Sequence, residues 1–373
     1  MSMTTLSPHQ PDEGLEPVVE DLGIFLIAGR AKDPSIALTQ GEDAERLGFR
    51  RAWLSERYDL KDAGALLGGV SARTTRLEVG TGVLASASRH PLVTAGLAGT
   101  MQAMYGGRFI LGLGRSASEY LAKQSMTIHN LRAFGDYIEI VRSLLGGETV
   151  SYDGPAGIYE EMRCADLPAN GVPPIWYVTE GGPKACRLAA EHADGVMLKP
   201  FMTVEAAAQS VRWIRTAREE LGKDPGIRIC LPVITACELD ELQTTMISKC
   251  RLITYVAGMP GFAANFVRSN DWDASVMQAI QEHPQFASMT RPNADQSFHR
   301  DQLLEPAKLI PDQWMQDSCA IGSVEACVDR LREYKAVGID EFAFYGSTPQ
   351  DNATLIAGWR QRSHHEPTNE AQA

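Results

Sequence analysis

The feature that most restricts the fold is a regular alternation of short apolar runs with segments of helical periodicity. Eight runs are typical of buried strands, and each is followed by a helical pattern. The expected strands are 22–27, 51–54, 77–81, 109–113, 174–178, 195–198, 227–234 and 341–345. Such alternation requires parallel strands joined by helical crossovers, and eight units close a barrel. The predicted fold class is therefore α/β, a (β/α)8 TIM barrel.

The expected helices carry start and stop signals of their own. A helix opens at Asp33-Pro34 and ends before Gly48, which is placed as the residue just past its end. The expected helices are 33–47, 62–73, 91–105, 129–145, 183–192, 203–221, 239–256, 324–336 and a short closing helix that ends at 359.

Two segments do not fit a minimal barrel. Residues 147–173 are expected to form an extended insertion before the fifth strand, and residues 257–320 interrupt the seventh unit with an irregular sequence. Long loops in compact domains are usually functional, so both are expected near the barrel top, where they shape a substrate pocket or a subunit contact. The barrel domain is expected to cover 21–362, and the polar segments 1–20 and 363–373 are expected to be disordered.

Composition limits the class of function. The chain has 373 residues, 44% of them apolar and 22% charged, which is ordinary for a globular enzyme. Its net charge of −12 argues against a nucleic-acid partner, which needs a basic surface. No run approaches the roughly 20 apolar residues of a membrane span, and the amino terminus lacks the apolar core of a signal peptide. Seven cysteines without a C-x-x-C pair favour reduced thiols, so we expect a soluble, cytoplasmic protein that acts on a small molecule.

In a TIM barrel the chemistry lies at the carboxyl ends of the strands. The fifth strand leads into TEGGPK at 179–184. Gly181 and Gly182 precede Pro183, a favoured first helical residue, so they lie at a helix N-terminus. Free N–H groups and the helix dipole bind a phosphate there, and Lys184 adds positive charge. The alternative is a tight turn in which the glycines serve backbone geometry alone.

The fourth strand ends in a second glycine pair, Gly112-x-Gly114, followed by Arg115-Ser116. This spacing is not that of a dinucleotide-binding fingerprint, and close packing between strand and loop explains it equally well. No cluster of His, Asp or Glu has metal-ligand spacing, and no nucleophile elbow is present, so no metal is expected. The pattern indicates a cofactor site without a protein nucleophile.

Five segments occur in an order typical of one enzyme family. They are WLSERY at 53–58, TRLEVGTGVL at 75–84, RHP at 89–91, GRFILGLG at 107–114 and AAEHADG at 189–195. Over about residues 22–362 the chain resembles the luciferase-like superfamily, and within it the mycobacterial-type branch of F420-dependent oxidoreductases.

The resemblance implies where a cofactor binds. The ring system would pack against a non-prolyl cis peptide after the third strand, at Gly82-Val83, and the phosphate would bind at Gly181-Gly182. The expected cofactor-binding residues are Gly82, Val83, Gly114, Arg115, Ser116, Thr179, Gly181, Gly182 and Lys184. The resemblance also implies a homodimer.

Two departures from the family pattern affect the expected chemistry. Many relatives carry His where Arg57 stands, and sugar-phosphate dehydrogenases of the superfamily carry an acid where this chain has Ala117. Arg57 is too basic to act as an ordinary base, but it can stabilise an anion developing on the ring or the substrate. Proton transfer then falls to Glu56, Tyr58 or Tyr345.

The expected function is hydride transfer between the deazaflavin coenzyme F420 and an unidentified small organic substrate, with the cofactor carrying the redox chemistry. One alternative is a monooxygenase that uses reduced FMN and dioxygen. A second is a non-catalytic barrel that binds flavin. Basic residues able to hold a polyglutamate tail favour F420, and the candidates are Arg115, Lys184 and Lys199.

Overall fold

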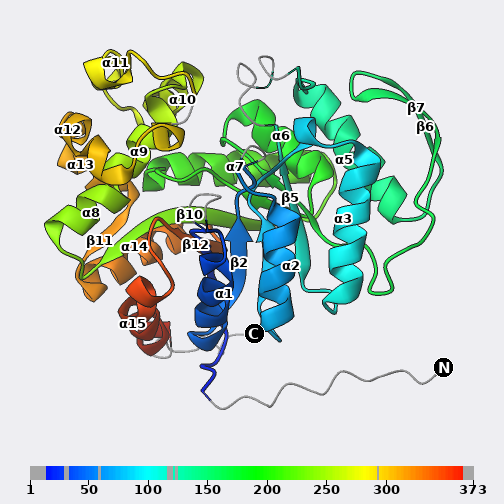
Figure 1. Ribbon diagram of the computed structural model, residues 1–373, viewed down its shortest axis with the longest axis horizontal. Coiled ribbons are helices and arrows are strands. Elements are labelled where there is room, and N and C mark those ends of the chain that lie inside the picture. Colours follow the sequence, from blue (N-terminus) through cyan, green and yellow to red (C-terminus); the bar gives the residue numbers. More distant parts are fainter. Residues whose placement is uncertain are drawn as a thin grey trace.

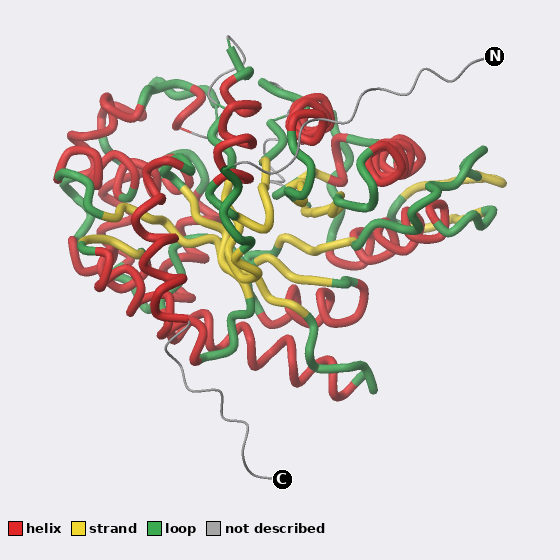
Figure 2. Tube along the Cα trace, turned by 90° about the horizontal axis from the view of Figure 1, so that it is seen from below, coloured by secondary structure: helices red, strands yellow, loops and turns green. Residues whose placement is uncertain are grey.

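A computed structural model of the chain describes residues 14–28, 33–57, 60–115, 121, 125–291 and 294–363. The barrel strands are β1 (Val19–Phe25), β2 (Phe49–Leu54), β3 (Glu78–Thr81), β5 (Phe109–Gly114), β8 (Ile175–Val178), β9 (Gly195–Met197), β10 (Arg228–Cys237) and β12 (Glu341–Tyr345). They pair in parallel in the order β1-β2-β3-β5-β8-β9-β10-β12, and β12 pairs back with β1. The strands gather at the centre of the molecule, with helices outside them (Figure 2). All eight expected strands are present, and the predicted TIM barrel is confirmed.

Helices surround this sheet (Figure 1). They are α1 (Ile36–Arg46), α2 (Ala63–Arg73), α3 (Pro91–Met104), α5 (Leu131–Leu145), α6 (Pro183–His192), α7 (Val204–Glu220), α8 (Glu241–Ile247), α9 (Lys249–Val256), α14 (Val324–Ala336) and α15 (Ala353–Ser363). Side-chain caps fix several starts: Asn130 accepts from the third residue of α5, and Thr203 and Ser323 do the same for α7 and α14. The single helix expected at 239–256 is two helices, which break at Ser248 (φ −96°, ψ −78°).

The insertion at 147–173 is a hairpin at one edge of the molecule (Figure 1). Its antiparallel strands are β6 (Val150–Gly154) and β7 (Gly157–Met162). A two-residue strand, β4 (Leu84–Ala85), follows β3 and pairs with β5.

The segment 257–320 is mostly helical, so the expectation of an irregular segment there is wrong. It contains α10 (Pro260–Asn270), α11 (Ala274–Gln281), α12 (Leu304–Ala307), α13 (Asp312–Ser318) and a strand, β11 (Ala320–Gly322), that pairs with β10. Single 3-10 turns also occur along the chain: η1 (Ser86–Ser88), η2 (Pro284–Phe286), η3 (Ala294–Gln296), η4 (Arg300–Leu303) and η5 (Gln350–Asn352). The segment packs with α9 and the end of β10 in a second apolar core, in which the rings of Trp272 and Trp314 stack at 4.4 Å. Its helices have four to eleven residues, too few turns for most of them to show a clear period in the sequence.

The barrel begins slightly earlier than expected. Val19 and Glu20 belong to β1, although the sequence placed them in a disordered segment, because the Val19 amide donates to the Gly48 carbonyl at 2.8 Å. Residues 14–18 and 363, also expected to be disordered, are described, and the Glu16 amide donates to the Arg46 carbonyl at 2.9 Å. The other residues expected to be disordered, 1–13 and 364–373, lie outside the described part of the chain. No helix in the described part is long and apolar enough to span a membrane.

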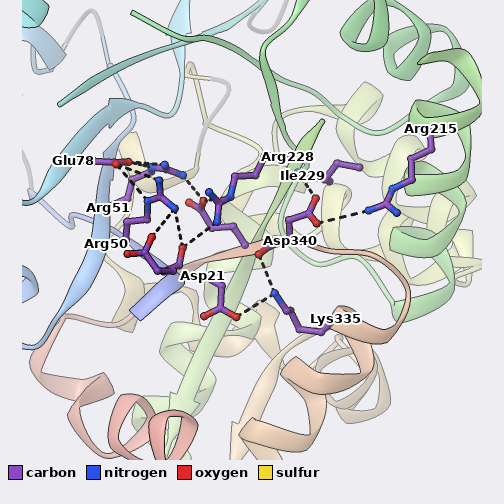
Figure 3. A network of polar contacts seen from close by, with 11 residues as sticks. Asp21, Arg50, Arg51, Glu78, Arg215, Arg228, Ile229, Lys335 and Asp340 are labelled. Carbon is purple, nitrogen blue, oxygen red and sulfur yellow. Dashed lines mark hydrogen bonds and ion pairs between the residues drawn. The ribbon is translucent and has the colours of Figure 1, made fainter. Parts of the chain in front are cut away.

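Apolar side chains fill the barrel and charged side chains close its amino-terminal end. Inside, the rings of Trp53 and Trp176 lie 5.3 Å apart. Below them the guanidinium of Arg51 faces both rings, at 5.7 and 5.1 Å from their centroids. Arg51 donates to the fully buried Glu341. Its Nε also donates to Glu78 at 2.8 Å (Figure 3).

We call this charged layer the barrel floor; it comprises Arg51, Glu78, Arg228 and Glu341. Arg228 Nε lies 3.3 Å from Glu341 Oε2, so two guanidinium groups share this carboxylate. Burial opposes the charge of Arg51, but Glu341 and Glu78 outweigh that effect and raise the pKa of its guanidinium above the ordinary value. The floor therefore pairs its buried cation with acidic groups.

Candidate active site at the barrel mouth

The turn after β3 forms one wall of the barrel mouth. The peptide bond between Gly82 and Val83 is cis, as the resemblance led us to expect. Two groups of the chain after β2 hold its carbonyl groups: Ser55 Oγ donates to the Gly82 oxygen at 2.6 Å, and the Glu56 amide donates to the Val83 oxygen at 3.0 Å. A Cβ at Gly82 would lie 3.0 Å from the ring of Phe25, so the turn passes close to the end of β1.

The glycines that end β5 serve close packing. A Cβ at Gly112 would lie 1.8 Å from the Thr81 carbonyl oxygen, and one at Gly114 would lie 2.6 Å from Val83 Cγ2. This matches the packing explanation that the sequence left open. Next to Gly114, the positive charge of the half-buried Arg115 acts on the Tyr177 hydroxyl: burial raises the pKa of that hydroxyl, and Arg115 opposes this effect. Ser116, also expected to bind the cofactor, lies outside the described residues.

The turn after β8 presents an open helix N-terminus. Thr179 Oγ1 accepts from the Gly181 amide at 3.3 Å, and Ser210 Oγ donates to the Gly181 carbonyl at 3.1 Å. Gly181 has φ +81°, a conformation that favours glycine. Gly182 is the N-cap of α6, and α6 has no side-chain cap.

This N-terminus can accept an anion. A Cβ at Gly182 would meet nothing within 4 Å. The first intrahelical hydrogen bond is donated by Cys186, so the amides of Lys184 and Ala185 have no carbonyl partner inside the helix. The Lys184 side chain is exposed on the first turn. Together, open space, unbonded amides and the positive end of the dipole match the requirements of a phosphate.

Glu56 and Arg57, which follow β2, both form ion pairs. Glu56 is buried and accepts from Arg89 at 2.6 Å and from Ser88 at 3.2 Å. Arg57 Nη2 lies 2.7 Å from Asp295 Oδ1. Burial opposes the charge of Arg57, but Asp295 outweighs it and raises the pKa of Arg57 above the ordinary value. Arg57 is therefore a permanent cation at the mouth, whereas Tyr58 lies outside the described residues.

Tyr345, which the sequence offered for proton transfer, lies among mouth residues that the sequence did not single out. Tyr255 and Tyr345 join their hydroxyl groups at 2.8 Å, and the guanidinium of Arg251 lies 4.8 Å from the Tyr345 ring centroid. Arg300 Nη1 donates to the Gly346 carbonyl at 3.2 Å. Three of these side chains come from α9 and η4, beyond the end of β10. An arginine on a helix is usually exposed at the surface, so nothing in the sequence indicated that these residues line the mouth.

Lys199 lies two residues past the end of β9 and is only 5% exposed. Its Nζ donates to Asn265 and to Ser269 Oγ at 2.8 Å, and lies 4.6 Å from the Phe266 ring centroid. Burial lowers the pKa of Lys199 to about 7. Glu180 opposes this effect and Arg268 adds to it, and of the three cations expected to hold a polyglutamate tail, Lys199 is the buried one.

A polar hollow lies beside the mouth, next to the ends of β2 and β3. Its volume is about 530 Å³, and its lining is Glu56, Leu60, Lys61, Asp62, Ser88, Arg89, His90 and Val93. Within the described ranges, no three side chains of His, Cys, Asp or Glu come together in a way that suits a metal ion.

Comparisons with known proteins agree with this geometry. A family model described as luciferase-like monooxygenase matches residues 6–341. A 5,10-methylenetetrahydromethanopterin reductase of Methanolobus tindarius is 28% identical over 187 residues, which cover 49% of this chain and 55% of the reductase. The match thus spans about half the length of that relative. An F420-dependent glucose-6-phosphate dehydrogenase of Segniliparus rotundus is 27% identical over 320 residues, covering 81% of this chain and 85% of the dehydrogenase.

A solved structure extends the likeness across the barrel. The coenzyme F420-dependent tetrahydromethanopterin reductase from Methanopyrus kandleri superposes with a TM-score of 0.73 at 19% identity. The superposition covers 94% of this chain and 100% of the reductase chain. At this level of identity the likeness establishes the fold.

Proposed function

We propose that this chain, which belongs to the luciferase-like monooxygenase family, is an oxidoreductase that binds coenzyme F420 at the barrel mouth. It would transfer a hydride between F420 and a small organic substrate. The observation that carries the proposal is the uncapped N-terminus of α6, with open space in front of Gly182. Relatives named for F420 support the choice of cofactor.

The residues present fit the phosphate of such a cofactor. Gly182 offers backbone without a side chain, and the Ser210 hydroxyl fixes the carbonyl of Gly181 from behind. Arg115 and Lys184 add positive charge on either side of the turn after β8. A phosphate bound here would interact with amides and dipole without displacing a protein side chain.

The turn at Gly82-Val83 fits the ring system. Its carbonyls are already bonded to Ser55 and Glu56, so its backbone is fixed before any cofactor binds. The half-buried Val83 side chain is supported from behind by Gly114. When bound, the deazaflavin supplies the carbon that gives or takes the hydride, and the protein orients it.

The charged and hydroxyl groups around the mouth define what the chain itself contributes. Arg57 remains protonated and stabilises negative charge that develops on ring or substrate. Glu56 is committed to Arg89, so its proposed role is to hold that arginine and the turn after β3 in place. The hydroxyl of Tyr345, bonded to Tyr255, is the described group best suited to hold a proton at the mouth.

The family description names monooxygenases, so FMN-dependent oxygenation is the second candidate. A parallel titration of the purified apo-protein with F420 and with FMN, each followed by fluorescence, separates the two. We expect F420 to bind at least tenfold more tightly. Tighter binding of FMN would replace the proposal with the second candidate. Binding of neither would contradict both.

A further inference from the structure

A group of cationic side chains gathers on one side of the barrel mouth. Arg57 follows β2, Arg251 lies on α9 and Arg300 begins η4. They meet around the end of β12, where Arg251 stacks on the ring of Tyr345 and Arg300 donates to the carbonyl of Gly346. We call these three residues the arginine cluster.

The arginine cluster has little negative charge to balance it. Within the described ranges, Arg57 pairs with Asp295 at 2.7 Å, whereas neither Arg251 nor Arg300 forms an ion pair with a carboxylate. Arg251 is 92% buried, since its exposure is 8%, and its Nε has no hydrogen-bond partner among the described groups. A buried guanidinium nitrogen without an acceptor is costly, and at the barrel mouth a bound anion can supply the acceptor.

The lowered pKa values of neighbouring basic groups agree with an excess of positive charge at this side of the mouth. Burial and then Arg251 lower the pKa of Arg300 to about 10. Burial and then Arg57 lower the pKa of Lys61 to about 8, with Asp295 acting in the opposite direction and Arg251 in the same one. The hydroxyls of Tyr255 and Tyr345 and the thiol of Cys250 also face these cations. In a chain of net charge −12, this is a local reversal of sign.

We infer that the arginine cluster is an oxyanion subsite and that the substrate carries a carboxylate or phosphate group. Guanidinium forks match both groups in shape and charge, and Tyr345 offers a hydroxyl beside them. The inference rests on the proposed function, because it names the substrate class for the same mouth.

The position of the arginine cluster separates it from the cofactor's own phosphate. The phosphate position at Gly182 follows β8, and in the closed strand order β12 lies three strands from β8. A cofactor phosphate at α6 therefore leaves the arginine cluster available to a second anion across the mouth.

The test measures binding of benzoate, phenyl phosphate and the neutral benzamide to the full chain, with and without F420. Calorimetry gives the affinities and thermal unfolding gives the stability of each variant. We expect benzoate or phenyl phosphate to bind at least tenfold more tightly than benzamide, and the tighter anion identifies the substrate group. Arg251→Met is expected to weaken that anion at least tenfold. Arg212→Met, which removes an exposed arginine on α7, is the matched control and should change nothing.

The stability readout distinguishes a subsite from a structural arginine. Arg251→Met should unfold at the same or a higher temperature than the parent chain, because it removes an unpaired buried charge, and it should lose the stabilisation by anion. A lower unfolding temperature with unchanged anion binding would overturn the inference, as would equal binding of benzamide. If Arg251→Met does not fold, anion affinity and unfolding temperature are measured on Arg300→Met instead, with the same expected and contradicting results.

Measuring F420 affinity on the same variants distinguishes the oxyanion subsite from the proposed function. Unchanged F420 affinity in Arg251→Met supports a substrate subsite, whereas a loss of F420 affinity would show that the arginines hold the cofactor and would overturn the inference. If no variant binds F420, the proposed function fails, and the anion affinities still decide whether the arginine cluster is an oxyanion site.

Discussion

The two ends of this barrel hold buried arginine in opposite ways. At the floor, Arg51 lies between Glu341 and Glu78, and every charge has a partner of opposite sign. At the mouth, Arg251 stacks on an aromatic ring, and its Nε has no acceptor in the described part of the chain. A paired buried charge is costly to break, whereas an unpaired one is available to a ligand. On this difference we propose that the floor serves folding and the mouth serves binding.

The floor should give the largest effect on stability. Glu341→Gln leaves Arg51 and Arg228 without the carboxylate that they share, and it should lower the free energy of unfolding by about 3–5 kcal/mol. Urea denaturation measures this change. Glu20→Gln is the control, because Glu20 forms an exposed pair with Arg50 whose loss should cost less than about 1 kcal/mol. Equal effects of the two substitutions would contradict the view of the floor as a stabilising network.

At the mouth, a substitution should weaken binding while leaving the fold intact. Gly182 has φ −78° and ψ 159°, which any residue can adopt, and a side chain there meets open space. Gly182→Asp should cap α6 and raise stability by a few tenths of a kcal/mol, yet repel the cofactor phosphate. We expect F420 affinity to fall at least tenfold, about 1.4 kcal/mol, in a fluorescence titration.

Gly182→Asn is the matched variant, because it caps the helix without adding charge. Its F420 affinity should lie between those of the parent chain and Gly182→Asp. If the aspartate and asparagine variants bind F420 as well as the parent chain does, the phosphate does not bind at this N-terminus.

The floor and the mouth also differ in how far the sequence predicts them. The eight strands could be predicted because each is a short apolar run bounded by turn residues, and Gly181-Gly182-Pro183 marks a helix start by local rules alone. The role of Gly114 could not be decided, because it depends on Val83, which reaches it only in the folded barrel. Arg251 and Arg300 gave no signal, since their placement depends on how α9 and η4 pack over the end of β12.

Lys199, a buried cation past the end of β9, should make the stability of the chain depend on pH. Its folded-state pKa of about 7 lies below the ordinary value, so the cost of its charge is fully present below pH 7 and diminishes as the pH rises toward 10. The stability of the parent chain relative to Lys199→Met should therefore rise with pH, by up to about 1.4 kcal/mol per unit. Urea denaturation at pH 7, 8 and 9 measures this slope.

Lys335→Met is a control for the pH dependence of stability expected from Lys199→Met. Lys335 lies among the polar contacts of Figure 3, 3.2 Å from Asp21, so its cation has an acidic partner. The difference in stability between the parent chain and Lys335→Met should not rise over the same pH window. A flat difference for Lys199→Met as well would show that Asn265 and Ser269 compensate for its burial.

The smallest expected effect concerns Asp295, the acid that pairs with Arg57 of the arginine cluster. Asp295 accepts from Arg57 and so competes with any bound anion for that guanidinium. Asp295→Asn should raise benzoate affinity about threefold, roughly 0.6 kcal/mol, because the pair is partly exposed and its interaction is correspondingly weak. Asp301→Asn, on the neighbouring turn, controls for the change in net charge. Weaker benzoate binding in Asp295→Asn would instead mean that Asp295 positions Arg57 for the anion, and the mouth would then resemble the floor in relying on a paired charge.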